Sequence, residues 1–317
     1  MKKSTIVKTF KFMVPIMRLC YRVRAVCKFG IGNYFRVCFA KSENKGRRHF
    51  LSVLVCAKDE ATYLTEWLEY HLMLGVEKFY FYDNESTDNT REVLAPYIAR
   101  GTVEYIFWRG RKQQMAMYAD ALRRFSDRTE WLAIIDIDEF INPITFDDIP
   151  SFLNKVPRGA TQIYLAWDNF GSSGHKKRPD GLVIENYKYY NNAPRGKSLV
   201  NPRAVVGLSN PHMLEVIGDT VDENFRPFRF WDWVGKIAIW PGREFPRSKI
   251  KINHYQLKSL EEFLAKQVRG RANGKEGDVA KYSATAFAAK DTGHHLDKSI
   301  LRFVPALKQQ INSNGQL

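Results

Sequence analysis

The segment 131–140 constrains this chain most, because an apolar run is followed directly by acids. Residues 131–135 are Trp-Leu-Ala-Ile-Ile, which indicates a buried β-strand. Asp136 and Asp138 follow, with Glu139 beside them. Ligands of an open parallel sheet bind beyond the carboxyl ends of its strands, where two carboxylates suit Mg²⁺ or Mn²⁺ holding substrate phosphates. The alternative is a polar turn that ends a strand.

The net charge of +15 is concentrated near the amino terminus of the 317-residue chain. Residues 1–48 hold 13 Lys or Arg and one acid, a net charge of +12, whereas residues 49–317 hold 36 basic and 33 acidic residues, a net charge of +3. A hydrophobic content of 44% indicates that the rest of the chain folds. Its near balance of charge argues against a nucleic-acid-binding protein, so we expect no nucleic acid among the partners.

The basic segment 1–48 has the pattern of a helix that lies on a membrane surface. No uncharged run in it approaches the ~20 residues that a membrane span needs. We therefore expect residues 1–30 to contact an anionic membrane surface, the alternatives being a helix packed on the body or a floppy tail. The pattern is an apolar side of Ile6, Phe10, Met13, Met17 and Tyr21 opposite Lys8, Lys11, Arg18 and Arg22.

Strands and helices alternate in the first half of the body. Apolar runs predict strands at 50–56, 78–82, 102–108 and 131–135, and helical periodicity predicts helices around 64–72, 93–98 and 113–125. His71 is expected to pack inside the first helix rather than to bind a ligand. This alternation predicts an α/β fold, a Rossmann-like, doubly wound and mostly parallel sheet.

Polar residues follow three of these strands, at positions that a parallel sheet brings to one edge. The chain has neither of the glycine-rich phosphate motifs, so a nucleotide here would need a metal for its phosphates. The polar residues are Asp59 and Glu60 after the first strand, Asp83 and Asn84 after the second, and Asp136 and Asp138 after the fourth.

The pattern changes after residue 143. A short helix is predicted over 147–156 and a strand over 162–167, followed by a small-residue loop, 168–175. The stretch 176–247 shows weak periodicity and is expected to form irregular strands and long loops that bind an acceptor. Ser259 and Glu262 form a capping box for a helix that ends at Gly270. A charged, glycine-rich loop at 270–278 and a last helix near 296–311 complete the chain.

Six motifs spread over residues 58–270 together resemble one family. They are Lys58-Asp-Glu60 with Glu66-Trp67 to His71, Asp83-Asn-x-Ser-x-Asp88, Gln114 with Tyr118 and Asp120, Trp131 to Phe140, Phe170-Gly-Ser-Ser-Gly-His175, and His254-Tyr-x-x-Lys-Ser-x-Glu-Glu-Phe263 with Lys266. The chain resembles glycosyltransferase family 92 and related family-2-like enzymes of bacterial type, whose nucleotide-sugar-binding fold is called GT-A. The resemblance covers roughly residues 50–305. It divides the chain into a leader (1–48), a nucleotide-sugar-binding half (49–143), an acceptor-binding and catalytic half (144–290) and a C-terminal helix (291–317).

The resemblance implies a hexosyltransferase that depends on Mn²⁺ or Mg²⁺. The donor would be a nucleotide diphosphate sugar, by default a UDP-hexose such as UDP-galactose, and the acceptor a glycan or glycolipid. Asp136 and Asp138 are similar to the metal-and-ribose pair, Asp138 being the direct metal ligand, and His254 is similar to a third metal ligand. The other implied nucleotide contacts are Lys58, Glu60, Asp83, Asn84 and Gln114.

Two residues depart from the family pattern. Asp59 stands where the family usually has Asn, which adds a negative charge near the diphosphate. Phe225 stands where the family often has Gly, which questions the geometry of the acceptor-side loop.

Family 92 members invert the sugar configuration, which requires a carboxylate base for the acceptor hydroxyl. The candidates are Asp222, Glu223 and Asp168, and Asp222 is preferred because similar enzymes take the base from its region. Alternatively, Asp222 and Glu223 are loop acids without a catalytic role.

Two other functions fit part of the pattern. A metal-dependent nucleotidyltransferase or phosphohydrolase would use the same acid pair, and a non-catalytic basic protein would bind membranes or nucleic acid without it. All four cysteines lie within the first 56 residues, so none can cross-link the body, and this favours a reducing compartment. By analogy, we expect a peripheral enzyme on the cytoplasmic face of a bacterial inner membrane, building lipopolysaccharide or capsule.

Overall fold

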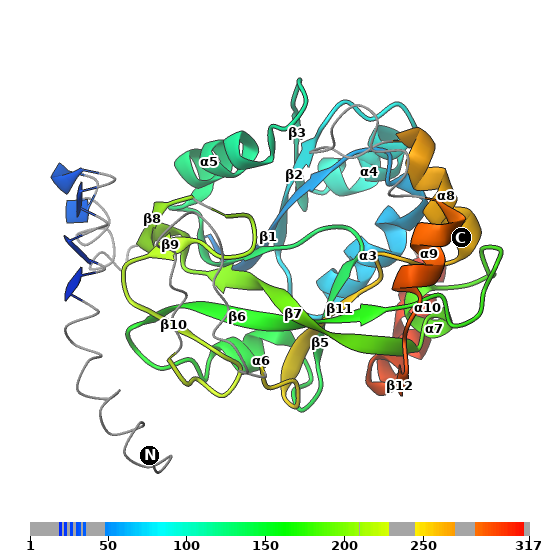
Figure 1. Ribbon diagram of the computed structural model, residues 1–317. Helices are drawn as coiled ribbons and strands as arrows, with labels where there is room; N and C mark the ends of the chain where they lie inside the picture. Colours follow the sequence, from blue (N-terminus) through cyan, green and yellow to red (C-terminus); the bar gives the residue numbers. More distant parts are fainter. Residues whose placement is uncertain are drawn as a thin grey trace, which may run out of the picture.

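The computed structural model describes scattered residues between 19 and 35, and then residues 48–208, 210–227, 245–269 and 283–313 (Figure 1). The predicted apolar stripe of the leader and the predicted loop 270–278 lie outside these residues. Within the described part of the chain, no helix is both long and apolar enough to cross a membrane.

One mixed sheet forms the centre of the molecule, with strand order β3-β2-β1-β4-β7-β6-β11-β5, β10 beside β6, and β12 beside β7 (Figure 1). Its strands come from both predicted halves of the body and from the predicted C-terminal segment. They are β1 (His49–Ala57), β2 (Lys78–Asp83), β3 (Val103–Phe107), β4 (Thr129–Ile134), β5 (Glu139–Pro143), β6 (Ala160–Phe170), β7 (Tyr189–Val200), β10 (Asp219–Val221), β11 (Ile250–His254) and β12 (His295–Leu296). A separate pair is formed by β8 (Val205–Gly207) and β9 (Glu215–Val216).

Helices cover both faces of the parallel part of the sheet. Alternate residues of β1 face opposite sides, so Leu51 and Val53 pack in the cluster that contains Trp67 of α3, whereas Leu54 packs with Met117 of α5. Fully burying an apolar side chain of this kind contributes about 1.5–3 kcal/mol. The helices are α3 (Ala61–Met73), α4 (Thr90–Ala99), α5 (Gln114–Phe125), α6 (Ile149–Leu153), α7 (Val183–Asn186), α8 (Leu260–Arg269), α9 (Ala284–Lys290) and α10 (Val304–Ser313), with 3₁₀ turns η1 (Pro202–Ala204) and η3 (Ser299–Phe303). The predicted doubly wound α/β fold is confirmed.

The strand directions place several loops at one edge of the sheet. β1, β2, β3 and β4 are parallel, β7 is antiparallel to both β4 and β6, and β11 is parallel to β6. The carboxyl ends of β1, β2, β4, β6 and β11 therefore lie along the same edge. β5 runs antiparallel to β11, so its first residue lies at that edge too.

The stretch 176–247, predicted to form irregular strands and long loops, contains the 12-residue strand β7, whose pairing with β6 has a register shift. This strand contains Asn191, Asn192 and Lys197, so its sequence lacks the apolar alternation that identifies strands. Lys197 is buried because two acids from the neighbouring segment neutralise it. The last predicted helix is also shorter than expected, since 296–303 contains the end of β12 and the turn η3 before α10 begins.

Local backbone geometry explains both departures from the family pattern. Asp59 has φ +52°, and its carboxylate accepts hydrogen bonds from the backbone N–H groups of Thr87 (2.6 Å) and Asp88 (3.3 Å). It therefore holds the loops after β1 and β2 together. Phe225 has φ +58°, a left-handed conformation that favours glycine, and its ring stacks on Phe152 at 5.3 Å.

Candidate metal and nucleotide site

A tight turn connects β4 to β5 and presents the acids of the opening motif. The Glu139 N–H donates to the Asp136 carbonyl (3.0 Å), and the Asp136 N–H donates to Glu139 Oε2 (3.0 Å). The Tyr255 N–H donates to the Asp138 carbonyl at 2.7 Å. The turn is thereby attached to the end of β11.

Aromatic side chains of α3 donate hydrogen bonds to the backbone of β5. Trp67 Nε1–H donates to the Glu139 carbonyl (2.8 Å), and the Tyr70 hydroxyl donates to the Ile141 carbonyl (2.9 Å). His71 is fully buried, with Nδ1 at 2.8 Å from the Trp67 carbonyl, and burial lowers its pKa to about 3. His71 is therefore a neutral packing residue, as the sequence predicts.

Asp138, Glu139 and His254 form a three-residue cluster at the edge of the sheet. One ligand atom of each lies within 4.8 Å of the others, and His254 Nε2 is 3.6 Å from Asp138 Oδ1. Strand pairing produces this cluster, because Glu139 is the partner of His254 in the β5–β11 register. The structure thus brings two predicted ligands together and adds Glu139, which the sequence analysis did not assign to the metal.

The third predicted ligand, Asp136, points to a different partner. Its Oδ2 lies 2.9 Å from Nζ of Lys197, which is also 3.7 Å from Glu139 Oε2. Burial lowers the pKa of the Lys197 amine, but Asp136 and Glu139 outweigh burial, so the pKa lies well above its usual value. Lys197 thus stays charged between the two acids. It was missed because one lysine in a polar stretch carries no signal.

The cluster has the chemistry of a divalent metal site. Glu139 is fully buried, and its Oε1 has no hydrogen-bond partner. Burial raises the pKa of this carboxyl well above its usual value, and a divalent cation bound at its free oxygen would stabilise the ionised form. His254 Nδ1 is 3.0 Å from Asn169 Oδ1; since an amide oxygen only accepts, Nδ1 carries the proton and Nε2 is left for a metal. Two carboxylates and an imidazole fit Mn²⁺ or Mg²⁺.

The charge of Asp138 is stabilised by its neighbours. Burial raises the pKa of its carboxyl, but His254 and Lys266 outweigh burial, and the pKa lies well below its usual value. Lys266 Nζ is 3.5 Å from Asp138 Oδ2. Asp138 is therefore ionised, as a metal ligand must be.

The predicted nucleotide contacts lie along the same edge. Lys58 and Glu60 follow β1 and are half-buried. Asp83, at the end of β2, accepts from the Ser86 N–H (2.9 Å) and the Tyr105 hydroxyl (2.5 Å). Their contact with a nucleotide remains a prediction.

Two further predicted contacts shape this edge. Asn84 Nδ2 donates to the carbonyls of Trp108 (3.1 Å) and Gly110 (2.9 Å), which joins the loops after β2 and β3. Gln114 opens α5 and donates to the hydroxyl of Tyr118 at 3.1 Å. A role in nucleotide binding remains a prediction for both.

Asp222 and Glu223 lie far from the metal cluster. Glu223 accepts hydrogen bonds from the N–H groups of residues 248–250, at the start of β11, whereas His254 ends that strand. Four residues of strand separate the two ends by about 13 Å. Asp222 Oδ1 accepts from the N–H groups of Asn224 (2.9 Å) and Arg226 (3.0 Å). Asp222 thus fixes a turn, and Glu223 attaches that turn to the start of β11.

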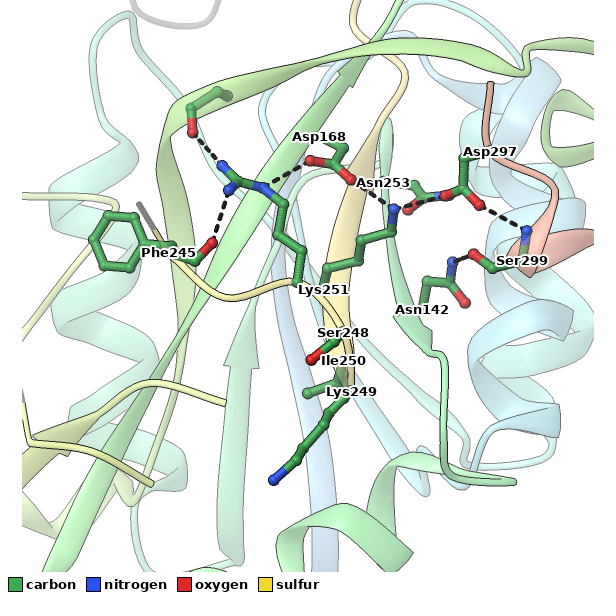
Figure 2. Close-up of polar contacts among 12 residues, drawn as sticks. Asn142, Asp168, Phe245, Ser248, Lys249, Ile250, Lys251, Asn253, Asp297 and Ser299 are labelled. Carbon is green, nitrogen blue, oxygen red and sulfur yellow. Dashed lines mark hydrogen bonds and ion pairs between the residues drawn. The ribbon is translucent and has the colours of Figure 1, made fainter. Parts of the chain in front are cut away.

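Asp168 lies in a buried ion-pair network with Arg247, Lys251 and Asp297 (Figure 2). It precedes Asn169 on β6, and successive strand residues face opposite sides, so its carboxylate points away from the metal cluster. Its oxygens lie 2.8 Å from Arg247 Nε and 2.6 Å from Lys251 Nζ. All three acids thus make structural contacts, and a role as the base remains a prediction.

The fold and this cluster define a class of protein, namely an α/β chain with a carboxylate–histidine cluster that could hold a metal at the carboxyl edge of its sheet. The model of glycosyltransferase family 92 matches residues 52–268, which is more than half of the chain. The chain therefore belongs to glycosyltransferase family 92, and the resemblance seen in its motifs is confirmed.

Curated relatives come from plants. A glycosyltransferase family 92 protein of Oryza sativa subsp. japonica is 33% identical over 225 residues, covering 69% of this chain and 35% of that protein. One from Arabidopsis thaliana is 25% identical over 243 residues, covering 72% of this chain and 39% of that protein. The chain thus spans little more than a third of the length of these two relatives.

Solved structures show only a distant similarity. Residues 1–349 of TarS from S. aureus give a TM-score of 0.33 at 17% identity, covering 48% of this chain and 47% of that one. Glucosyl-3-phosphoglycerate synthase from Mycobacterium tuberculosis gives 0.27 at 19% identity, covering 44% and 48%. Similarities of this size carry no weight for function.

Proposed function

We propose that this chain is a metal-dependent, inverting glycosyltransferase that moves a hexose, galactose by default, from UDP to a glycan or glycolipid acceptor such as lipopolysaccharide or capsule. The observation that carries the proposal is the cluster of Asp138, Glu139 and His254, with one buried carboxylate oxygen unpartnered, in a chain of family 92. The donor, the acceptor and the metal are parts of the proposal.

The reaction explains why such a cluster is useful. The bond between the sugar carbon and the diphosphate oxygen breaks, and its electron pair leaves with the diphosphate. Asp138, Glu139 and His254 would hold Mn²⁺ or Mg²⁺, which neutralises that charge when bound, without proton transfer. Asn169 keeps the His254 ring in the required tautomer. Lys197 keeps the Asp136 carboxylate at the edge, where we propose that it binds the ribose.

The remaining nucleotide contacts that we propose are Lys58, Glu60, Asp83, Asn84 and Gln114. The acceptor hydroxyl forms the new bond to the sugar and loses its proton to a base. We propose this base among Asp222, Glu223 and Asp168, with Asp222 preferred, and note that the oxygens of all three make structural contacts away from the cluster.

A thermal-shift panel of nucleotide sugars, each with and without Mn²⁺, tests the proposal. A UDP-hexose with Mn²⁺ should raise the melting temperature more than either component alone. No shift with any nucleotide sugar would overturn the proposal. Release of phosphate or pyrophosphate without an acceptor would instead favour the metal-dependent nucleotidyltransferase or phosphohydrolase.

We also propose that residues 1–30 bind an anionic membrane surface, at the cytoplasmic face of a bacterial inner membrane. The net charge of +12 in residues 1–48 supports this. Deletion of residues 1–45 should release the protein from membrane pellets, and unchanged pelleting would reject the idea.

A further inference from the structure

A buried ammonium without a hydrogen-bond partner lies beside the metal cluster. Lys258 follows β11 by four residues, is 1% exposed, and its Nζ has no hydrogen-bond partner. The Nζ lies 3.5 Å from the centre of the Tyr63 ring, a cation–π contact that offsets only part of the cost of burial. Glu60, Asp138 and Glu262 attract this charge, but none of them forms a hydrogen bond with the ammonium, so its N–H groups are left for an anion that binds there.

The adjacent acid, Glu262, is already occupied. It accepts hydrogen bonds from the hydroxyls of Tyr63 (2.8 Å) and Tyr187 (2.5 Å) and from the N–H and hydroxyl of Ser259 (3.0 and 2.6 Å). These four donors use both of its oxygens. Glu262 therefore fixes the start of α8 as the predicted capping box, and does not bind Lys258.

A second lysine connects this ammonium to the metal cluster. Lys266 Nζ donates to the Gln256 carbonyl at 2.7 Å and lies 3.5 Å from Asp138 Oδ2. Burial, and then repulsion from Lys266, lower the pKa of Lys258 to about 8. The two ammonium groups repel each other, and an anion bound by both would relieve this repulsion.

We propose that Lys258 and Lys266 bind the diphosphate of the nucleotide donor and stabilise its charge as it leaves. This inference rests on the proposed function. A diphosphate held by a metal at Asp138 would lie next to Lys266, and its several oxygens can accept from two ammonium groups. A lysine binds phosphate as a compact charge and needs no fixed orientation, which suits these two flexible side chains.

The experiment compares Lys258→Met and Lys266→Met with the full-length wild type by calorimetric titration of UDP and of uridine in Mn²⁺. Both variants should bind UDP at least about tenfold more weakly, because each loses a charge-assisted hydrogen bond to phosphate, whereas uridine affinity should not change. Lys308→Met is the matched control. Lys308 is an exposed residue of α10 that forms an ion pair with Glu185 (2.6 Å). It should bind both ligands as the wild type does.

Stability provides a second readout that separates a ligand-binding lysine from a structural one. Removing an unpaired buried charge should raise the melting temperature of ligand-free Lys258→Met, whereas a structural lysine would lower it. Unchanged UDP affinity in both variants would overturn the inference, as would a melting temperature that falls for Lys258→Met. If wild-type protein does not bind UDP, the proposed function fails first. If the wild type binds UDP and both variants bind it equally well, the proposed function stands and this inference is wrong.

Discussion

Two polar clusters lie on opposite faces of the same strands, β6 and β11, and they differ in how completely their charges are paired. In the ion-pair network, Lys251 contacts both Asp168 and Asp297 at 2.6 Å. Arg247 contacts Asp168 and donates to the carbonyls of Phe245 and Ala193, both at 2.8 Å (Figure 2). Two acids and two bases therefore neutralise one another within the protein.

The metal cluster lies one residue further along β6, at Asn169, and three residues further along β11, at His254, and it is incomplete. Asn169 orients His254, but Glu139 Oε1 has no hydrogen-bond partner, nor has the ammonium of Lys258 nearby. A buried charge is expensive unless it is paired. The complete network therefore needs nothing more to be stable, whereas the incomplete cluster would gain from a cation and an anion, which the proposed function supplies with the substrate.

The largest effect should come from Asp138→Asn. Loss of a charged metal ligand removes several kcal/mol of stabilisation of the leaving group, so turnover should fall roughly a thousandfold. The measurements are the rate with the donor found by thermal shift and the affinity for Mn²⁺ by electron paramagnetic resonance. Asp127→Asn is the control, because Asp127 is an exposed partner of Arg203. Unchanged Mn²⁺ affinity in Asp138→Asn would show that this cluster is not the metal site.

Asp168→Asn tests the other half of the comparison. It leaves Lys251 and Arg247 partly uncompensated in a buried network, so the free energy of unfolding in urea should drop by about 3–5 kcal/mol. Turnover per folded molecule should fall far less than in Asp138→Asn. If Asp168→Asn is as stable as the wild type but has lost turnover, Asp168 is the base and not a structural residue.

The unpaired lysine predicts a specific dependence of stability on pH. Burial lowers the pKa of Lys258 from 10.5 to about 8, so between these values the unfolded chain binds more protons than the folded one. The cost of the buried charge is therefore full below pH 8 and disappears as the pH rises through this window. The free energy of unfolding should rise by up to about 3 kcal/mol relative to Lys258→Met. Urea titrations across the window measure it, and parallel curves would contradict the unpaired charge.

The smallest effect should come from Asn169→Ala. This change removes the acceptor for His254 Nδ1 but no metal ligand, so Mn²⁺ affinity should fall about 10–100-fold with little loss of fold stability. Calorimetric titration of Mn²⁺ provides the value. An affinity equal to that of the wild type would mean that strand packing alone orients the histidine.

Local patterns predicted the parallel half well. The runs at 50–56, 78–82 and 131–135 correspond to β1, β2 and β4 within two residues, because these strands are buried on both faces and their sequences are continuously apolar. The capping box of Ser259 and Glu262 was also predictable, since its partners lie three residues apart.

Residues whose role depends on distant partners were not predictable. Glu139 joins the metal cluster through its register with His254, 115 positions away in the chain. Asp222 and Glu223 were expected at the site because of their place in the chain, but β10 pairs with the beginning of β6, so they lie toward the opposite edge. The spacing of residues in the sequence does not specify the order of the strands in a sheet.

By itself, the sequence determined that residues 49 onward form an α/β sheet and that acids follow its fourth strand, because burial and helix capping act between near neighbours. Tertiary structure decided which acids form the candidate metal cluster and which are neutralised by lysine or arginine. Adjacent strand residues point to opposite faces, so the partners of Asp168 and Asn169 depend on what β11 places across from each of them.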